Sequence, residues 1–269
     1  GANEKNFYMK AKPKVLVMKT DGINCDEELA FAFELAGGVP KTVHVNDLRS
    51  KKENLKNFQI LAIPGGFSYG DDVVSGKILA VELTSFLSNE LKKFVQRKDT
   101  LTIGVCNGFQ VLVRTGLLPF GKVGKMDVTL AGNNSGHFEC RWINLNIDNG
   151  NRCVFLKGLK GPLSFQVAHG EGKFFANPEI LNKIEKEKLV VFRYSDSKGN
   201  PTQKYPANPN GSSNAIAGIC DPTGRILGLM PHPERFVRKE HHPNWRRIKI
   251  EKPQGLPIFE NMVSCVKKM

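Results

Sequence analysis

Three short apolar runs in the first 105 residues constrain the fold most strongly. They are "KVLVMKT" (14–20), "FQILAIPGG" (58–66) and "LTIGV" (101–105), with the length and composition of buried strands. Between them, residues 26–36 carry apolar positions at helical spacing, and residues 76–97 predict one long amphipathic helix. Because strands that alternate with helices pair in parallel, we predict an α/β fold, a mostly parallel, doubly wound sheet with helices on both faces.

The second half of the chain has shorter strand patterns and more turns. Its candidate strands are 137–147, 163–172, 188–195 and the two arms of a hairpin over 215–230. We expect them to extend or cap the first sheet and to add a small antiparallel sheet, before a C-terminal helix over 256–266. No repeat or low-complexity linker divides the chain, so we predict one domain over 13–269 behind a flexible extension at 1–12.

Composition excludes several classes of protein. No run approaches the roughly 18 apolar residues of a membrane span, and the polar N-terminus lacks the apolar core of a secretory signal. The six cysteines are scattered without a CxxC pair, which favours a reducing, cytoplasmic compartment and five cysteines buried as small apolar residues. The net charge of +13 is spread along the chain, so we interpret it as a solvated surface rather than a nucleic-acid groove.

The segment "LTIGVCNGFQVLV" (101–113) places Cys106 between a strand and a helical pattern. Gly104 and Gly108 lie two residues before and after it, which is the nucleophile-elbow pattern with sulfur in place of a serine oxygen. Glycines at these positions remove side chains that would clash in a sharp strand-to-helix turn. The helix N-terminus also favours a thiolate, so we predict that Cys106 is a nucleophile.

A cysteine nucleophile needs a base and a group that orients the base. The segment "GLMPHPERF" (228–236) offers His232 between two prolines and Glu234 two residues later. Two residues apart on an extended segment, these side chains can project to the same side, so Glu234 can hold the imidazole. For the oxyanion hole we select the backbone N–H groups of Gly66, in a glycine turn after a strand, and of Asn107.

At these residues the chain resembles the class I glutamine amidotransferases and, more narrowly, the glutaminase subunits of phosphoribosylformylglycinamidine synthases of de novo purine biosynthesis. The similarity covers roughly residues 13–266. The matching segments are "GINCDEE" (22–28), "PGGFSYGD" (64–71), "GVCNGFQ" (104–110), "HGEGKF" (169–174), "NPNGS" (208–212) and "MPHPER" (230–235).

The resemblance implies a flavodoxin-like fold and a Cys-His-Glu triad carried by Cys106, His232 and Glu234. It implies that glutamine is hydrolysed to glutamate and ammonia through a cysteinyl thioester. The substrate contacts that it implies are Gln110, Ser68 and the "HGEG" residues His169, Gly170 and Glu171. His169 and Glu171 also allow an interpretation as a second base and carboxylate, but pocket lining is preferred because "PHPE" matches the family's catalytic position.

The resemblance further implies a division of labour between subunits. The ammonia would pass to a partner synthetase subunit that makes formylglycinamidine ribonucleotide with ATP. This chain has no G-x-x-x-x-G-K-[ST] segment, the phosphate-binding motif of many ATP sites. We therefore expect no cofactor and no metal in this chain, with ATP and Mg²⁺ on the synthetase and a small accessory subunit as a further partner.

Two alternatives remain at this point. One is a related Cys-His hydrolase of similar architecture, such as a peptidase or a chaperone-like protein. The other is a basic nucleic-acid-binding module in which the cysteine is incidental, which steeply salt-dependent binding would reveal.

Overall fold

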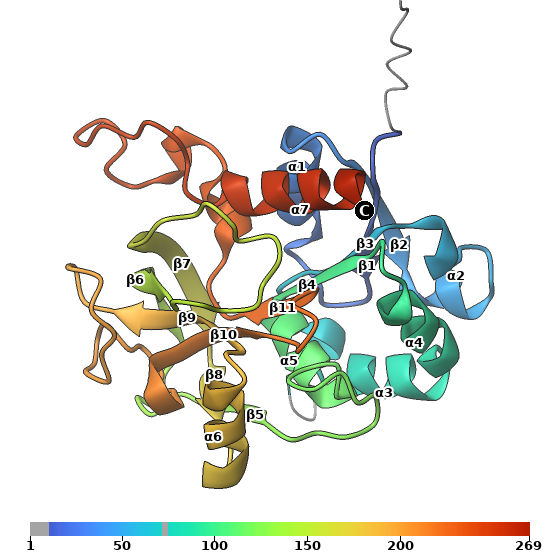
Figure 1. Ribbon diagram of the computed structural model, residues 1–269, viewed down its shortest axis with the longest axis horizontal. Helices are drawn as coiled ribbons and strands as arrows, with labels where there is room; N and C mark the ends of the chain where they lie inside the picture. The colour runs from blue at the N-terminus through green and yellow to red at the C-terminus, as the bar shows by residue number, and fades with distance from the viewer. Residues whose placement is uncertain (1–10, 72–74) are drawn as a thin grey trace, which may run out of the picture.

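The computed structural model describes residues 11–71 and 75–269, and one sheet of nine strands runs through it (Figure 1). Its strand order is β2-β1-β3-β4-β11-β10-β9-β6-β7. The predicted α/β sheet with helices on both faces is confirmed. The flexible extension at 1–12 and the single domain over 13–269 stay predictions, and all but the last two residues of the extension lie outside the described residues.

Five strands form the parallel half of the sheet, and their carboxyl ends meet at one edge. They are β2 (Val39–His44), β1 (Lys14–Lys19), β3 (Ile60–Ile63), β4 (Leu101–Val105) and β11 (Ile226–Leu229). Strand β4 lies between β3 and β11 and is buried throughout, which explains its uninterrupted apolar run. Because Leu229 of β11 pairs with Val105 of β4, the segments that follow these two strands begin side by side.

Four later strands continue the same sheet in antiparallel pairing. They are β10 (Ile216–Cys220), β9 (Val190–Ser195), β6 (Glu139–Ile147) and β7 (Leu163–His169). The predicted small antiparallel sheet is also present, formed by β5 (Thr129–Gly132) and β8 (Glu171–Phe175). Of the five cysteines expected to be buried, Cys140 is exposed, because it occupies an outward position of β6, and Cys265 is half-buried.

Helices cover both faces of the sheet. In Figure 1, α1 (Asp26–Leu35) and α7 (Leu256–Lys268) lie above it. The rings of Phe33 in α1 and Phe259 in α7 pack edge to face, with their centroids 5.1 Å apart. Below it lie α3 (Lys77–Ser85), α4 (Ser88–Gln96) and α5 (Asn107–Thr115). The other two α-helices of the described residues are the short α2 (Val45–Arg49), which follows β2, and α6 (Pro178–Lys186), which precedes β9.

The prediction of one long helix over 76–97 is wrong, because α3 and α4 are separated by a bend at Phe86 and Leu87. The apolar spacing continues across the bend and therefore hides it in the sequence. Hydroxyl side chains cluster there and compete with the helix for backbone hydrogen bonds. The Thr84 hydroxyl, for example, donates to the Ala80 carbonyl at 2.9 Å.

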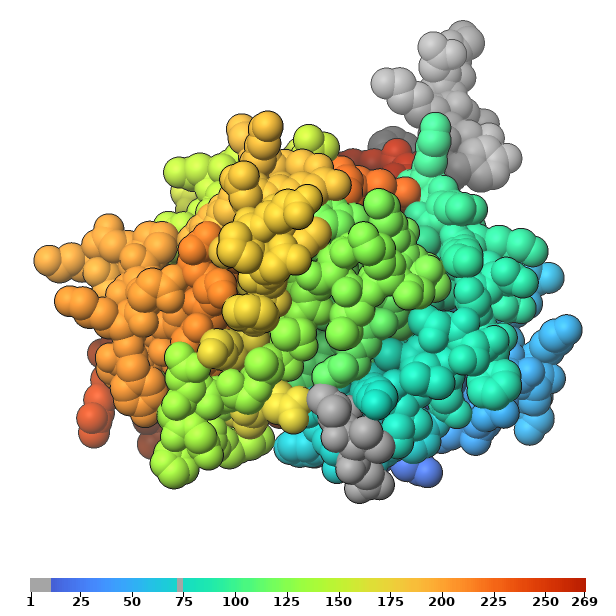
Figure 2. Space-filling model, turned by 90° about the horizontal axis from the view of Figure 1, so that it is seen from below, coloured from blue at the N-terminus to red at the C-terminus, as the bar shows by residue number. Residues whose placement is uncertain are grey.

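Figure 2 shows the face below the sheet, where green atoms from the middle of the chain lie between mostly cyan atoms of the first half and mostly yellow and orange atoms of the second. The two halves of the chain therefore flank the segment that begins at α5. None of the helices in 11–71 and 75–269 has both the length and the apolar character needed to cross a bilayer.

The turn from β4 into α5 depends on two close backbone approaches. A methyl group on Gly104 would lie 2.5 Å from the Gly108 carbonyl oxygen, and one on Gly108 would overlap the carbonyl oxygen of Ile63 in β3. Helix α5 thus rests directly on the backbone of two strands. The predicted reason for both glycines, removal of side chains at a sharp turn, agrees with this geometry.

We expect Gly108→Ala to destabilise the fold by about 1–3 kcal/mol, because the added methyl must push α5 away from the rigid β3 backbone. Urea unfolding of the wild type and variant measures the difference. Gly132→Ala is the matched control: open space surrounds Gly132, so a change within about 0.5 kcal/mol is expected. Equal unfolding midpoints for the two variants would show that the close approach of Gly108 to the Ile63 carbonyl does not affect the free energy of unfolding.

Candidate active site

Cys106 lies at the carboxyl end of β4, where the chain turns into α5. Its backbone has φ 52° and ψ −107°, a conformation that residues with side chains rarely adopt. The carbonyl of Cys106 accepts hydrogen bonds from the N–H groups of Phe109 and Gln110, so the turn is held by the first residues of the helix. Strain of this kind persists where the surrounding structure enforces it, and it is typical of functional sites.

His232 lies three residues beyond β11, the neighbour of β4. Its backbone N–H donates to the Gln166 carbonyl at 2.8 Å, which fixes the segment against β7. The ring nitrogen Nδ1 lies 2.6 Å from Oε1 of Glu234, and both side chains are buried. Burial lowers the pKa of His232, but the Glu234 carboxylate and Cys106 outweigh it and raise the pKa to about 10. The imidazolium form is therefore favoured.

Gly65 lies beside both the histidine and the cysteine, although its motif alone did not distinguish it from Gly66. A methyl group at Gly65 would lie 2.8 Å from Cε1 of His232 and 3.4 Å from Cβ of Cys106. The missing side chain leaves room beside both groups. Nε2 of His232 is buried and has no hydrogen-bond partner within 11–71 and 75–269, so it is free to exchange a proton with a reacting group.

Asn107, at the start of α5, is hydrogen-bonded to the glycine turn after β3. Its Oδ1 accepts a hydrogen bond from the backbone N–H of Ser68 at 3.4 Å, and its Nδ2 donates to Gln110 and to Asp71. Gly66 has φ 125° and packs against Asn24, which is 2.7 Å from the position its Cβ would take. The assignment of the Gly66 and Asn107 N–H groups to an oxyanion hole stays a prediction, as does the substrate contact of Ser68.

Gln110 joins α5 to β8. Its Nε2 donates to the Glu171 carbonyl at 2.5 Å, and its Oε1 accepts from Asn107 at 3.0 Å. Both ends of the amide are engaged, so contact with a substrate would require Gln110 to exchange one of these bonds. Oε2 of the Glu171 side chain is buried without a partner among the described residues. The substrate contacts predicted for Gln110 and Glu171 stay predictions.

His169, from the "HGEG" segment, is held on both sides of its ring. Nδ1 lies 3.0 Å from Oδ1 of Asn133, and Nε2 lies 3.4 Å from Nδ2 of Asn210. Burial lowers the pKa of His169 to about 4, helped by repulsion from His232, so the ring is neutral. With both nitrogens engaged, a role as a second base is disfavoured.

The two glycines of "HGEG" fit around this ring and the adjoining loop. A methyl group on Gly172 would lie 2.6 Å from the His169 ring, and the Gly170 carbonyl accepts a hydrogen bond from the Asn133 backbone N–H. The lining role predicted for His169 and Gly170 stays a prediction. Asn133, which connects them, carried no motif in the sequence and was missed.

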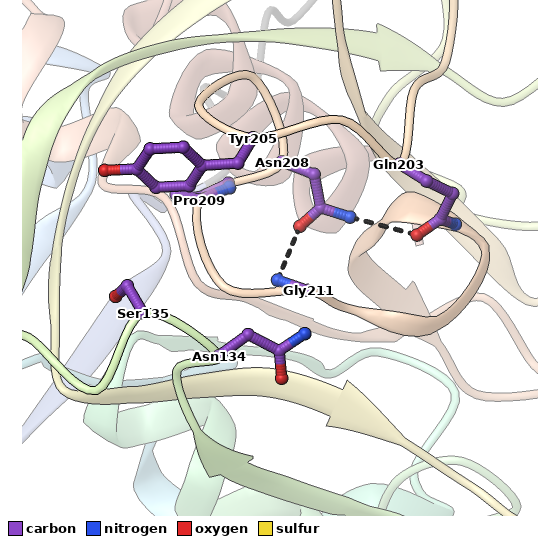
Figure 3. Close-up of a pocket in the computed structure, with 7 residues that line it drawn as sticks. All are labelled: Asn134, Ser135, Gln203, Tyr205, Asn208, Pro209 and Gly211. Carbon is purple, nitrogen blue, oxygen red and sulfur yellow. Dashed lines mark hydrogen bonds between the residues drawn. The ribbon is translucent and has the colours of Figure 1, made fainter.

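The "NPNGS" loop, to which the sequence assigned no role, is hydrogen-bonded to the backbone of strand β8. Asn210 donates to the Gly172 carbonyl at 2.9 Å, and the Ser212 hydroxyl accepts from the Phe174 N–H at 2.9 Å. A cavity of about 400 Å³ lies beside the loop. In its wall, Oδ1 of Asn208 accepts a hydrogen bond from the backbone N–H of Gly211 (Figure 3). The cavity is lined by Asn134, Ser135, Gln203, Tyr205, Asn208, Pro209 and Gly211.

Four side chains that can bind a metal, one of them His232, lie close together. One ligand atom from each lies within 4.8 Å of the others; the residues are Cys25, Glu28, His232 and Glu234. Arg235 borders this group, with Nη2 at 3.2 Å from the Cys25 sulfur. Cys25 and Arg235 belong to matching segments of the sequence, but neither was given a role. The expectation that the chain holds no metal stays a prediction.

Comparison with known proteins identifies the family. Residues 12–266 match the family described as CobB/CobQ-like glutamine amidotransferase domain. The phosphoribosylformylglycinamidine synthase subunit PurQ of Dehalococcoides mccartyi is 46% identical over 96% of this chain and 100% of its own. The subunit of the same name from Methanococcus maripaludis is 42% identical over 97% of this chain and 100% of its own.

A solved structure agrees with these sequences. A chain in the structure of PurLQS from Thermotoga maritima has a TM-score of 0.71 at 27% identity, over 95% of this chain and 99% of that chain. The chain therefore belongs to the CobB/CobQ-like glutamine amidotransferase family and, within it, to the PurQ subunits of phosphoribosylformylglycinamidine synthase.

Proposed function

We propose that this chain hydrolyses glutamine to glutamate and ammonia, using Cys106 as nucleophile, His232 as proton carrier and Glu234 as the group that orients it. The observation that carries the proposal is the juxtaposition at Gly65 of a strained cysteine and a histidine bonded to a buried carboxylate at 2.6 Å. This is the arrangement that acyl transfer through a thioester requires.

In the first half of the reaction, the Cys106 sulfur forms a bond to the side-chain amide carbon of glutamine, and the carbonyl oxygen becomes an oxyanion. The backbone N–H groups of Asn107 and Gly66 are the proposed donors to that oxyanion. The His232 imidazolium then donates its Nε2 proton to the amide nitrogen as the carbon–nitrogen bond breaks. Ammonia leaves, and the glutamyl group remains on Cys106 as a thioester.

In the second half, neutral His232 accepts a proton from a water molecule as the water oxygen attacks the thioester carbon. A second oxyanion forms and collapses, the carbon–sulfur bond breaks, and glutamate is released. The thiolate and imidazolium are thereby restored. Glu234 remains ionised throughout, and its negative charge stabilises the imidazolium in both halves.

The ammonia requires an acceptor that this chain does not supply. As a PurQ subunit, the chain works with a synthetase subunit, and the PurLQS assembly of Thermotoga maritima supports a further subunit. We propose that ATP and Mg²⁺ bind on the synthetase, which makes formylglycinamidine ribonucleotide, and that a small accessory subunit completes the complex. All six cysteines are free thiols, which supports a reducing, cytoplasmic compartment.

Cys106→Ala tests the nucleophile. We expect the variant, assembled with its synthetase, to lose glutamine-dependent synthesis while ammonia-dependent synthesis remains, because the synthetase site is untouched. Parallel assays with glutamine and with ammonium chloride measure the two activities. Glutaminase activity retained in the variant would contradict the assignment of Cys106 as the nucleophile.

Glu234→Gln tests the orienting carboxylate through the pH dependence of kcat/KM for glutamine. Glu234 raises the pKa of His232, so its neutralisation lowers that pKa and deprotonates the imidazolium at lower pH. We expect the alkaline limb of the profile to move to lower pH, with activity at neutral pH reduced about 100-fold or more. An alkaline limb in the wild-type position would contradict the proposed role.

A further inference from the structure

We propose that His232 and the three side chains beside it form a zinc site that reversibly inhibits glutamine hydrolysis. The four ligands are Cys25, Glu28, His232 and Glu234. The site uses two residues of the triad and two that the reaction does not need. Its occupant is a thiophilic divalent cation, for which Zn²⁺ is the natural candidate because it combines thiolate, imidazole and carboxylate ligands.

The positions of the four ligand atoms fit a tetrahedral cation after small movements. They lie within 4.8 Å of one another. Tetrahedral zinc, with bonds of about 2.0–2.3 Å, separates its ligand atoms by about 3.3–3.8 Å. Cys25 and Glu28 come from the start of α1, whereas His232 and Glu234 follow β11, so closure draws together two segments that are already in contact.

A buried oxygen at this site lacks a partner, which is an independent indication of a ligand. Oε1 of Glu234 bonds to His232, but Oε2 has no hydrogen-bond partner among the described residues. The Glu234 side chain is 0% exposed, and a buried carboxylate oxygen without a partner is costly. A cation that Glu234 bound through this oxygen would satisfy it.

The charges at the site balance when a divalent cation is bound. Cys25 as thiolate and the carboxylates of Glu28 and Glu234 carry three negative charges, and the Arg235 guanidinium contributes one positive charge. Arg235 already donates to Glu28 at 2.8 Å and contacts the Cys25 sulfur at 3.2 Å. A divalent cation therefore makes the cluster neutral. The Glu28 side chain is 38% exposed, so the site can be reached from solvent on that side.

Without a cation, Cys25 is an inert thiol. Burial raises its pKa, and the carboxylates of Glu234 and Glu28 raise it further. Zinc binding would displace the Cys25 proton and any proton on the coordinating nitrogen of His232 into solvent, as metal binding to such ligands requires. Cys25 thus takes no part in the catalytic cycle and reacts only when a cation binds.

Inhibition follows from the proposed function, in which His232 needs both ring nitrogens. If the cation binds Nδ1, it replaces the bond to Glu234, and if it binds Nε2, it blocks proton exchange with Cys106 and substrate. Either mode removes the proton carrier. Metal binding itself does not depend on the proposed function and can be measured separately.

The test uses Co²⁺ as a spectroscopic substitute for Zn²⁺, added to the full chain. We expect one tetrahedral Co²⁺ with a thiolate charge-transfer band. Cys25→Ser should abolish the band and weaken binding by about tenfold or more, whereas Cys106→Ala should retain both. The exposed Cys140 gives the matched control, Cys140→Ser, in which the band should persist.

Activity is measured in the complex with the synthetase. We expect Zn²⁺ to inhibit the wild type, a chelator to reverse the inhibition, and Cys25→Ser to be active but resistant. Glu28→Gln provides a second variant on the surface, with weakened inhibition expected, should Cys25→Ser fail to fold. A band lost in Cys106→Ala but kept in Cys25→Ser would place the cation on the nucleophile and overturn the proposal. Binding of Co²⁺ without inhibition by Zn²⁺ would overturn the inhibitory role.

Discussion

The parallel pairing of β4 with β11 is the constraint on which the active site depends. The register that sets Leu229 opposite Val105 brings the ends of two strands to one edge, although they lie more than a hundred residues apart in the chain. Cys106 follows one strand directly, and His232 follows the other after a short segment that is bonded to Gln166. A shift of this register would separate the sulfur from the imidazole without altering either residue.

The second half of the chain gives the site its other wall. Strand β7 runs past His232 and ends at His169, and the "NPNGS" loop fastens the following strand through Asn210 and Ser212. His169 fills this wall as a neutral ring whose nitrogens are both engaged. The loop therefore connects to the chemistry through the backbone of β8, to which Gln110 also bonds. This explains how a sequence signature can matter while lying outside the triad.

Site features that depend on local spacing along the chain could be predicted from the sequence. Features that depend on contacts between distant segments were missed. The elbow glycines and the pairing of His232 with Glu234 follow from spacing along the chain, so both could be anticipated. Gly65 could not be distinguished from Gly66, because only the folded chain shows which glycine faces the cysteine. Asn133 carried no motif, and the bend at Leu87 was hidden by apolar spacing that runs through it. For Gly65 and Asn133 the deciding neighbour is remote in sequence, whereas the bend follows from local hydroxyl side chains whose effect the apolar spacing conceals.

The electrostatics around His232 explain why the proposed catalytic histidine and the proposed cation site would coincide. A buried imidazolium is stable only beside negative charge, and Glu234 supplies it at 2.6 Å. Such a carboxylate must itself be balanced, and Arg235 stands next to it, bonded to Glu28 and the Cys25 sulfur. When the imidazole is neutral, however, the same carboxylates exceed the one guanidinium. The charge arrangement proposed to make His232 a proton carrier therefore leaves, when the imidazole is neutral, a negatively charged cluster of carboxylates beside the Cys25 thiol.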